Sequence, residues 1–300
     1  MTAISESGPG GPDTPRGAST TLPGTAANPR GRTDGRTAAR RGPVPPAGRR
    51  PGPPALVLVA HGSRDPRAPG TVRALLERVR ALRPGLPVHL GHIELNAPLL
   101  PDTLAALGDA DAVLVPLLLS RGYHVKRDIP EAAAASPART RVAAPLGPHP
   151  LLVDALHARL VEAGWRTGAD AAARRADAVV LAAAGSRDPE SRTDTDRTAR
   201  LLADRLGVPV LPAYASAAAP TVEDAVRHLA AQGRTRVALA SYFTAPGRFA
   251  AECADKAPWL AAAPLGTHPA VARLILHRYD RALAAPAAAR PEPAPARGAR

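Results

Sequence analysis

Two histidines stand where a parallel α/β sheet presents its ligand-binding groups. His61 opens the polar segment HGSRDP directly after the apolar run 55–60, and His124 lies in GYHV shortly after the apolar run 112–119. Short apolar runs that end in Gly and Pro are typical of buried strands, and open parallel sheets bind ligands beyond the carboxyl ends of their strands. Imidazole titrates near neutral pH and ligates divalent metal ions, so a converging pair could move protons or bind a metal.

Three other chemistries lack residues that they require. A histidine phosphatase holds phosphate with an arginine directly before His-Gly, where this chain has Ala60. A serine hydrolase based on Ser63 would need a Gly-x-Ser-x-Gly turn, which is missing from this loop. The sequence also has no Gly-x-x-x-x-Gly-Lys phosphate loop, so we expect any reaction that this chain catalyses to be independent of ATP.

The elements that must position the histidines alternate along the chain. Strands are expected near 55–60, 88–95, 112–119 and 141–145, and helices near 67–83, 98–107, 127–135 and 150–163. Repeated strand–helix units of this length predict an α/β fold with a parallel sheet flanked by helices.

The second half of the chain restates the first. AGSRDP (184–189) matches HGSRDP (61–66), and PLGTHP (264–269) matches PLGPHP (145–150). Segments 208–216 and 236–244 match the second and third strands of the first half. We therefore expect two similar lobes of about four strands each, related by duplication, packed as a monomeric pseudo-dimer with a cleft between them.

The duplication separates shared architecture from residues with a special role. His149 and His268 occur in both halves before a proline, so we interpret them as helix-start residues. GSRDP is also shared and could simply shape a turn. In contrast, Ala184 replaces His61 and Phe249 replaces His124, which predicts one site, in the first lobe.

The expected organisation has five parts. A Pro/Gly/Arg-rich tail (1–52) and a second tail (286–300) lack the large apolar residues that offset ordering entropy, so both are predicted to be disordered. Between them lie an active lobe (53–165), a linker (166–176) and a lobe with a degenerate site (177–285).

Composition excludes several partners and locations. The two tails carry +5 and +2 of the net charge of +13, and aromatic residues are scarce, so we expect no specific nucleic-acid partner. No apolar stretch approaches 18 residues and no signal peptide is recognisable, which predicts no membrane association. A single cysteine, Cys253, excludes an internal disulfide. These features predict a cytoplasmic protein.

Four segments resemble the class II tetrapyrrole chelatases, specifically the long, duplicated CbiX-type sirohydrochlorin chelatases. They are VAHGSRDP (59–66), IELNAPLLPDTL (93–104), VPLLLSRGYHVKRDIP (115–130) and PLGPHPLL (145–152). The resemblance covers about 55–284 and implies a lyase-type chelatase that inserts Fe²⁺ or Co²⁺ into sirohydrochlorin, for sirohaem or cobalamin biosynthesis. The metal would be a substrate, with no permanently bound cofactor.

Carried over residue by residue, the resemblance implies that His61 and His124 bind the incoming metal and help to deprotonate the macrocycle. Glu94 would be the third catalytic residue, as a ligand or a proton relay. His89 and His92 are less suitable, because they fall on or within the expected strand. A non-catalytic divalent-metal carrier or storage protein using the same histidine pair remains an alternative.

Substrate contacts are predicted from the charge of the substrate. Sirohydrochlorin carries eight carboxylates, and arginine binds carboxylates through paired hydrogen bonds. Ser63, Arg64, Arg121 and Tyr123 are the predicted substrate-binding residues, with Tyr123 packing on the macrocycle or filling the edge of the core. Further basic candidates, each equally consistent with ordinary solvated charge, are Lys126, Arg127, Arg187 and Arg248.

Overall fold

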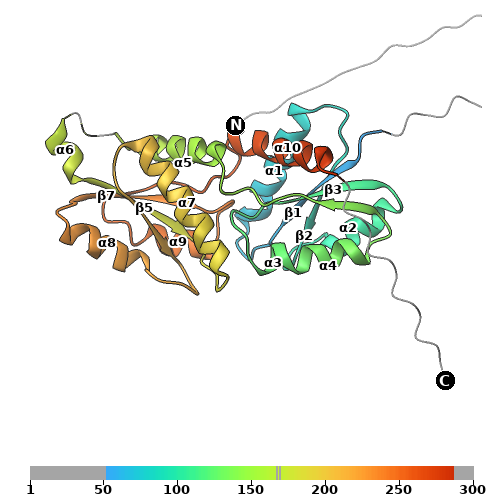
Figure 1. The fold of residues 1–300 in the computed structure, drawn as a ribbon, viewed down its shortest axis with the longest axis horizontal. Helices are drawn as coiled ribbons and strands as arrows, with labels where there is room; N and C mark the ends of the chain where they lie inside the picture. Colours follow the sequence, from blue (N-terminus) through green and yellow to red (C-terminus); the bar gives the residue numbers. More distant parts are fainter. Residues whose placement is uncertain (1–51, 167, 169, 287–300) are drawn as a thin grey trace, which may run out of the picture. The chain divides into compact units, whose positions relative to one another are not determined.

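A computed structural model describes residues 52–166, 168 and 170–286 (Figure 1). The tails that the sequence predicts to be disordered lie outside these residues, except for positions 52 and 286. Within the described ranges, no helix combines the length and the apolar character that crossing a bilayer requires.

The two repeats have the same succession of strands and helices, except that the first has two short helices after its third strand where the second has one. The first contains β1 (Ala55–Ala60), α1 (Arg67–Leu82), β2 (Val88–His92), α2 (Leu100–Leu107), β3 (Asp111–Pro116), α3 (Tyr123–Lys126), α4 (Asp128–Ala135), β4 (Arg139–Val142) and α5 (Pro150–Glu162). The second contains β5 (Asp177–Ala183), α7 (Pro189–Leu206), β6 (Val210–Tyr214), α8 (Val222–Ala231), β7 (Arg236–Tyr242), α9 (Arg248–Ala254), β8 (Leu260–Ala261) and α10 (Pro269–Ala284). A short helix, α6 (Ala171–Ala176), occupies part of the segment expected to be a linker.

Each repeat forms one four-stranded parallel sheet. The strand orders are β2-β1-β3-β4 and β6-β5-β7-β8, and every pairing is parallel. The registers correspond, since Leu58 pairs with Leu90 and Val115, just as Leu181 pairs with Pro212 and Ala240. The predicted fold of two similar α/β lobes is confirmed.

The central strand of each sheet is buried on both faces. Leu56 and Leu58 of β1 belong to one apolar cluster, and Val57 and Val59 belong to another on the opposite face. The first cluster also contains Val179 of β5, so one core runs through both repeats. A parallel sheet covered on both faces explains why these strands read as continuous apolar runs.

The last helix of each repeat packs on the sheet of the other repeat. Helix α5 contacts α7 and β7, whereas α10 contacts α1, β3 and β4; Figure 1 shows α10, in red, beside α1. Two equivalent arginines fasten the exchanged helices: Arg159 Nη2 donates to the Leu265 carbonyl (3.0 Å), and Arg278 Nη2 donates to the Leu146 carbonyl (2.8 Å). Each repeat therefore supplies the helix that covers part of the other repeat's sheet.

A histidine begins each exchanged helix. The His149 Nδ1 accepts a hydrogen bond from the Leu151 amide (3.1 Å), and the His268 Nδ1 accepts one from the Ala270 amide (3.2 Å). Burial lowers the pKa of both imidazoles, which favours the neutral form that can accept these bonds. Their interpretation as helix-start residues is confirmed.

The strands that lead to the site end earlier than the sequence suggests. β2 ends at His92. The amides of Ile93 and Glu94 still donate to the carbonyls of Ala60 and His61, and the chain then turns at Leu95 (φ +66°). Strand β3 ends at Pro116, and the Leu117 carbonyl accepts a hydrogen bond from a second-repeat side chain.

Candidate active site

The structure brings the two predicted histidines together. His61 follows the last residue of β1, and His124 lies on the one-turn helix α3, which the sequence did not predict. Their ring centroids are 4.6 Å apart and the rings are nearly perpendicular, at 89°. The side chains are 44% and 34% exposed, so both imidazoles are accessible to a ligand.

Glu94 completes a three-residue group with these imidazoles. Its Oε1 lies 3.6 Å from Nδ1 of His61. Glu94 lies two residues beyond β2, where its backbone amide donates to the His61 carbonyl (3.0 Å). Gly62 has φ +103°, and a Cβ at this position would lie 1.9 Å from the Glu94 carbonyl oxygen. A glycine is therefore required for His61 and Glu94 to lie side by side.

Asp128 is a site residue that the sequence analysis missed. Its Oδ2 accepts a hydrogen bond from Nδ1 of His124, one helical turn away. A carboxylate on Nδ1 places the proton on that nitrogen and leaves Nε2 free to accept a metal ion or a proton. Nδ1 of His61 likewise faces the Gly62 carbonyl (3.3 Å). The i, i+4 spacing in HVKRD is the signal that could have revealed Asp128.

The ligand set at this site is open. Across residues 52–166, 168 and 170–286, no group of three or more His, Cys, Asp or Glu side chains is arranged to hold a metal ion. The imidazole pair with one adjacent carboxylate thus leaves coordination positions for water or for atoms of a second ligand. Such incompleteness distinguishes reactive metal sites from closed structural ones.

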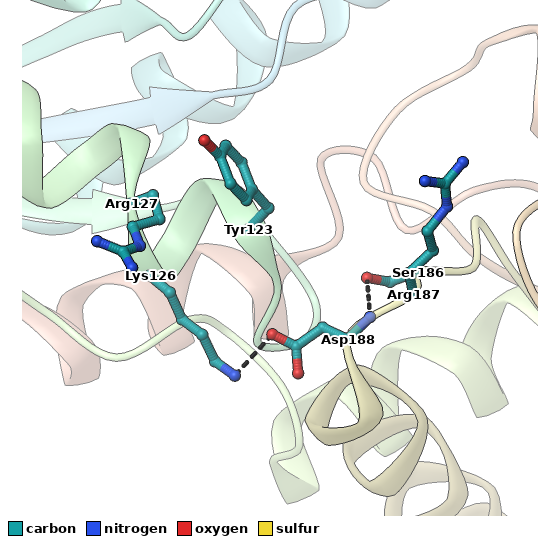
Figure 2. Close-up of a pocket in the computed structure, with 6 residues that line it drawn as sticks. All are labelled: Tyr123, Lys126, Arg127, Ser186, Arg187 and Asp188. Atoms are coloured by element: carbon teal, nitrogen blue, oxygen red, sulfur yellow. Dashed lines mark hydrogen bonds and ion pairs between the residues drawn. The ribbon is translucent and has the colours of Figure 1, made fainter.

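A cavity of about 670 Å³ is lined by Tyr123, the neighbour of His124 in the chain, although neither His61 nor His124 belongs to its wall. The first repeat contributes Tyr123, Lys126 and Arg127 to its wall, and the second contributes Ser186, Arg187 and Asp188. Tyr123 is 66% exposed, and its ring centroid lies 6.3 Å from that of His124. Figure 2 shows Tyr123 between Arg127 and Arg187, with the ion pair of Lys126 and Asp188 below them.

The basic candidates fall into two groups. Arg121 is bound by Asp194 and Glu190, and Lys126 by Asp188 and Glu190; these hydrogen bonds raise the pKa of both side chains. Arg121, predicted to bind substrate, therefore has its guanidinium engaged by the second repeat.

Other arginines near the site are less constrained. In the part of the chain that the structure describes, no ion pair involves Arg64, Arg127 or Arg187. Arg248 lies over the Phe249 ring and 3.6 Å from Glu252.

Ser63 shapes the turn in which it lies. Its Oγ accepts a hydrogen bond from the Asp65 amide (3.1 Å), and Ser186 makes the same bond with Asp188 (3.1 Å). The turn-shaping interpretation of GSRDP is thus confirmed, while a contact of Ser63 with substrate stays a prediction. The Ser63 amide also donates to Oδ1 of Asn96 (2.7 Å), which fixes the loop beside Glu94.

The second repeat has lost both imidazoles and both carboxylates of this group but kept its backbone. The Ser216 amide donates to the Ala184 carbonyl (3.0 Å), as Glu94 does to His61, so Ser216 stands in place of Glu94. Phe249 replaces His124, and the buried Cys253 replaces Asp128. The equivalent positions therefore cannot form a second imidazole site.

The fold and the site define a duplicated α/β protein with an accessible imidazole pair at the carboxyl ends of the strands of its first sheet. The CbiX family model matches residues 55–163 and 178–282, and the chain belongs to this family. The solved structure of SirB from Bacillus subtilis with Fe³⁺ superposes with a TM-score of 0.62 at 25% identity, over 77% of this chain and 95% of that one.

Relatives of known name match parts of the chain. A sirohydrochlorin cobaltochelatase of Methanococcus maripaludis is 39% identical over 80 residues, covering 26% of this chain and 56% of the relative. A sirohydrochlorin ferrochelatase of Bacillus subtilis is 29% identical over 185 residues, covering 58% of this chain and 68% of the relative. A sirohydrochlorin cobaltochelatase of Priestia megaterium is 26% identical over 204 residues, covering 64% of each chain. The chain spans about half the length of the methanococcal relatives.

Proposed function

We propose that this protein is a sirohydrochlorin chelatase, which inserts Fe²⁺ or Co²⁺ into the tetrapyrrole. The observation that carries the proposal is the pair of accessible imidazoles at 4.6 Å in the first repeat. Family membership supports it, because the named relatives are cobaltochelatases and a ferrochelatase. Supply of sirohaem or cobalamin, a lyase-type reaction without ATP, action as a monomer and a cytoplasmic location belong to the same proposal.

The reaction requires two exchanges at the metal. The hydrated ion gives up water as His61 and His124 bind it through Nε2, and Glu94, whose Oε1 lies 3.6 Å from Nδ1 of His61, serves as a nearby proton acceptor. Each of two pyrrole N–H bonds then breaks, leaving its electron pair on nitrogen to form a bond to the metal. The two released protons pass to Glu94, or to an imidazole Nε2 that the departing metal has freed, and then to water, which balances the charge. Imidazole suits both steps because it ligates divalent ions and titrates near neutral pH.

The macrocycle would bind in the cavity beside the histidines. Tyr123 offers an exposed ring for packing on the macrocycle. Arg127 and Arg187, which form no ion pair with the residues that the structure describes, offer their guanidinium groups for its carboxylates. Arg64 belongs to the same proposal as an exposed group in the loop after His61. Arg121 and Ser63 are weaker candidates, because their polar groups already bind Asp194, Glu190 and Asp65.

The test is an anaerobic insertion assay. Purified protein is mixed with sirohydrochlorin and either Co²⁺ or Fe²⁺, and the absorption change of the metallated product is followed. His61→Ala and His124→Ala should each lower the rate by 100-fold or more, because each removes one of two principal ligands. His277→Ala is the matched control, since His277 is also exposed and lies 5.1 Å from another imidazole, that of His149.

The same assay separates a chelatase from a metal carrier. A carrier would bind Co²⁺ through the histidine pair, and insertion would proceed no faster than in the absence of protein. That result, or near-normal turnover in a variant lacking both histidines, would contradict the proposal. Competition between Fe²⁺ and Co²⁺ in one reaction identifies the preferred metal, which imidazole and carboxylate ligands do not specify by themselves.

A further inference from the structure

The segment that carries His124 has little support of its own. Helix α3 has four residues, no side-chain cap at its N-terminus and no buried residue. Its own repeat holds it through Asp128 and two backbone bonds, from the Lys126 amide to Gly122 and from the Arg127 amide to Tyr123. Helices this short are unstable in isolation, so contacts outside the helix must fix the position of His124.

The second repeat supplies these contacts through the first two turns of α7. Asp194, which is 3% exposed, accepts hydrogen bonds from the Arg121 amide, Nε and Nη2 at 2.9, 2.9 and 2.7 Å. Glu190 accepts from Nη1 of Arg121 (2.6 Å) and pairs with Nζ of Lys126 (2.5 Å). Carboxylates of α7 thus hold the chain just before α3 and again at its last residue.

Two further contacts join residues 120–126 to the start of α7; we call all these contacts together the junction network. Oγ of Ser120 lies 2.8 Å from Oγ of Ser191, and Asp188 pairs with Lys126 at 2.6 Å. Bidentate arginine–carboxylate geometry fixes direction as well as distance. We therefore expect these contacts with α7 to fix the position of residues 120–126.

The equivalent contact in the duplicated fold, between α1 and the segment before α9, lacks this network. Arg67 and Thr71 of α1 stand where α7 has Glu190 and Asp194, and Pro246 stands in place of Arg121. Arg67, Thr71 and Pro246 line a cavity of about 490 Å³, and no ion pair joins the described residues of this junction. The junction network and the imidazole pair therefore occur on the same side of the duplicated fold, and both are missing from the other side.

We propose that Asp194, assisted by Glu190, is a positioning residue for His124. By holding Arg121 and Lys126, the second repeat, which has no imidazole at the positions equivalent to His61 and His124, keeps His124 within reach of His61. The inference rests on the proposed function only in taking His124 as a metal ligand.

The test compares two aspartates that each bind an arginine of the other repeat. Asp194 binds Arg121 beside the site, whereas Asp280 of α10 binds both terminal nitrogens of Arg83 (2.6 and 2.8 Å) on another side of the first repeat. Full-length Asp194→Ala and Asp280→Ala are titrated with Co²⁺ without tetrapyrrole. In parallel, the His124 ring signal is recorded by ¹H–¹³C NMR and assigned with His124→Gln.

Asp194→Ala should weaken Co²⁺ binding at least tenfold and shift the His124 signal. Asp280→Ala should leave affinity within twofold and the signal in place, even where the two variants lose similar melting temperature. Asp194→Asn, which keeps an acceptor for the Arg121 amide, should fall between wild type and Asp194→Ala. If Asp194→Ala does not fold, Glu190→Gln and Lys126→Met should each weaken binding about threefold.

Equal effects of the two aspartate variants on Co²⁺ affinity, or an unmoved His124 signal in Asp194→Ala, would overturn the inference. When Asp194→Ala does not fold, unchanged affinity in both Glu190→Gln and Lys126→Met would do the same. Absence of Co²⁺ binding by the wild-type protein would instead count against the proposed function, and the NMR comparison would still decide whether Asp194 positions His124.

Discussion

Replacement of Gly62 by alanine should separate the stability of the fold from the activity of the site. The new Cβ would lie 1.9 Å from the Glu94 carbonyl oxygen, and Cβ atoms essentially never approach closer than 3.0 Å, so the Glu94 loop must retreat by at least 1.1 Å. Gly185 is the matched position in the second repeat, with φ +90° and a Cβ only 1.8 Å from the Ser216 carbonyl oxygen. The same substitution therefore causes the same steric conflict in each repeat.

The stability cost follows from backbone strain and overpacking. A left-handed conformation costs an alanine ~1–2 kcal/mol, and forced overpacking typically adds ~1–3 kcal/mol. Gly62→Ala and Gly185→Ala should thus each lower the free energy of unfolding by ~2–5 kcal/mol, measured by urea denaturation. Only Gly62→Ala displaces Glu94 and His61, and a 1 Å misplacement in a site can lower the rate about 100-fold.

The assay is metal insertion into sirohydrochlorin at a temperature where both variants are fully folded. We expect Gly62→Ala to lose about 100-fold in rate and Gly185→Ala to lose less than threefold. Equal losses in the two variants would refute the reasoning, because a general loosening of the fold would then explain both. Full activity in a destabilised Gly62→Ala would refute the assigned role of the Glu94 loop.

Three further predictions concern the second repeat, the helix starts and the exchanged helices. Phe249→His should leave Co²⁺ binding at one ion per chain in equilibrium dialysis, because Ala184 still lacks the partner imidazole; two ions would contradict this. The lowered pKa values of His149 and His268 mean that the unfolded chain binds more protons, so unfolding free energy should fall as pH drops below about 6.5. The double variant His149→Asn, His268→Asn keeps both caps and should flatten that dependence in urea titrations between pH 7.5 and 5.5; an unchanged pH dependence would contradict this. The fragments 1–166 and 167–300 should each show no cooperative unfolding alone but should form a 1:1 complex when coexpressed. Cooperative unfolding of either fragment by itself would show that it does not need the helix supplied by the other.

Most of the fold could be predicted because its signals are local and occur twice. The apolar run that forms β1 has the length and composition of a buried strand, and its recurrence in β5 revealed the duplication. The meeting of His61 and His124 followed from parallel topology, since the chain after β1 and the chain after β3 emerge at the same edge of the sheet.

The helix exchange could not be predicted from these patterns. Helices α5 and α10 both begin with His-Pro and both bury an apolar face, and either sheet could cover that face. Periodicity identifies which residues of a helix are buried but not which surface buries them.

The finer parts of the site were missed for related reasons. Helix α3 is too short to produce a helical period, so His124 was expected in a loop. The hydrogen bonds of Arg121 to Glu190 and Asp194 could not be predicted, because these carboxylates are 69 and 73 positions away in the chain. Only folding reveals that such distant charges lie together.

The exchange of α5 and α10 has an evolutionary consequence. A duplicated gene usually can discard the copy that has lost its activity, but here truncation before β5 would expose the apolar surface of β3 and α1 that α10 covers. We therefore expect substitutions at the positions equivalent to the site to be tolerated in the second repeat, and deletion of that repeat to destabilise the first. Loss of the imidazole pair does not by itself make the second repeat dispensable.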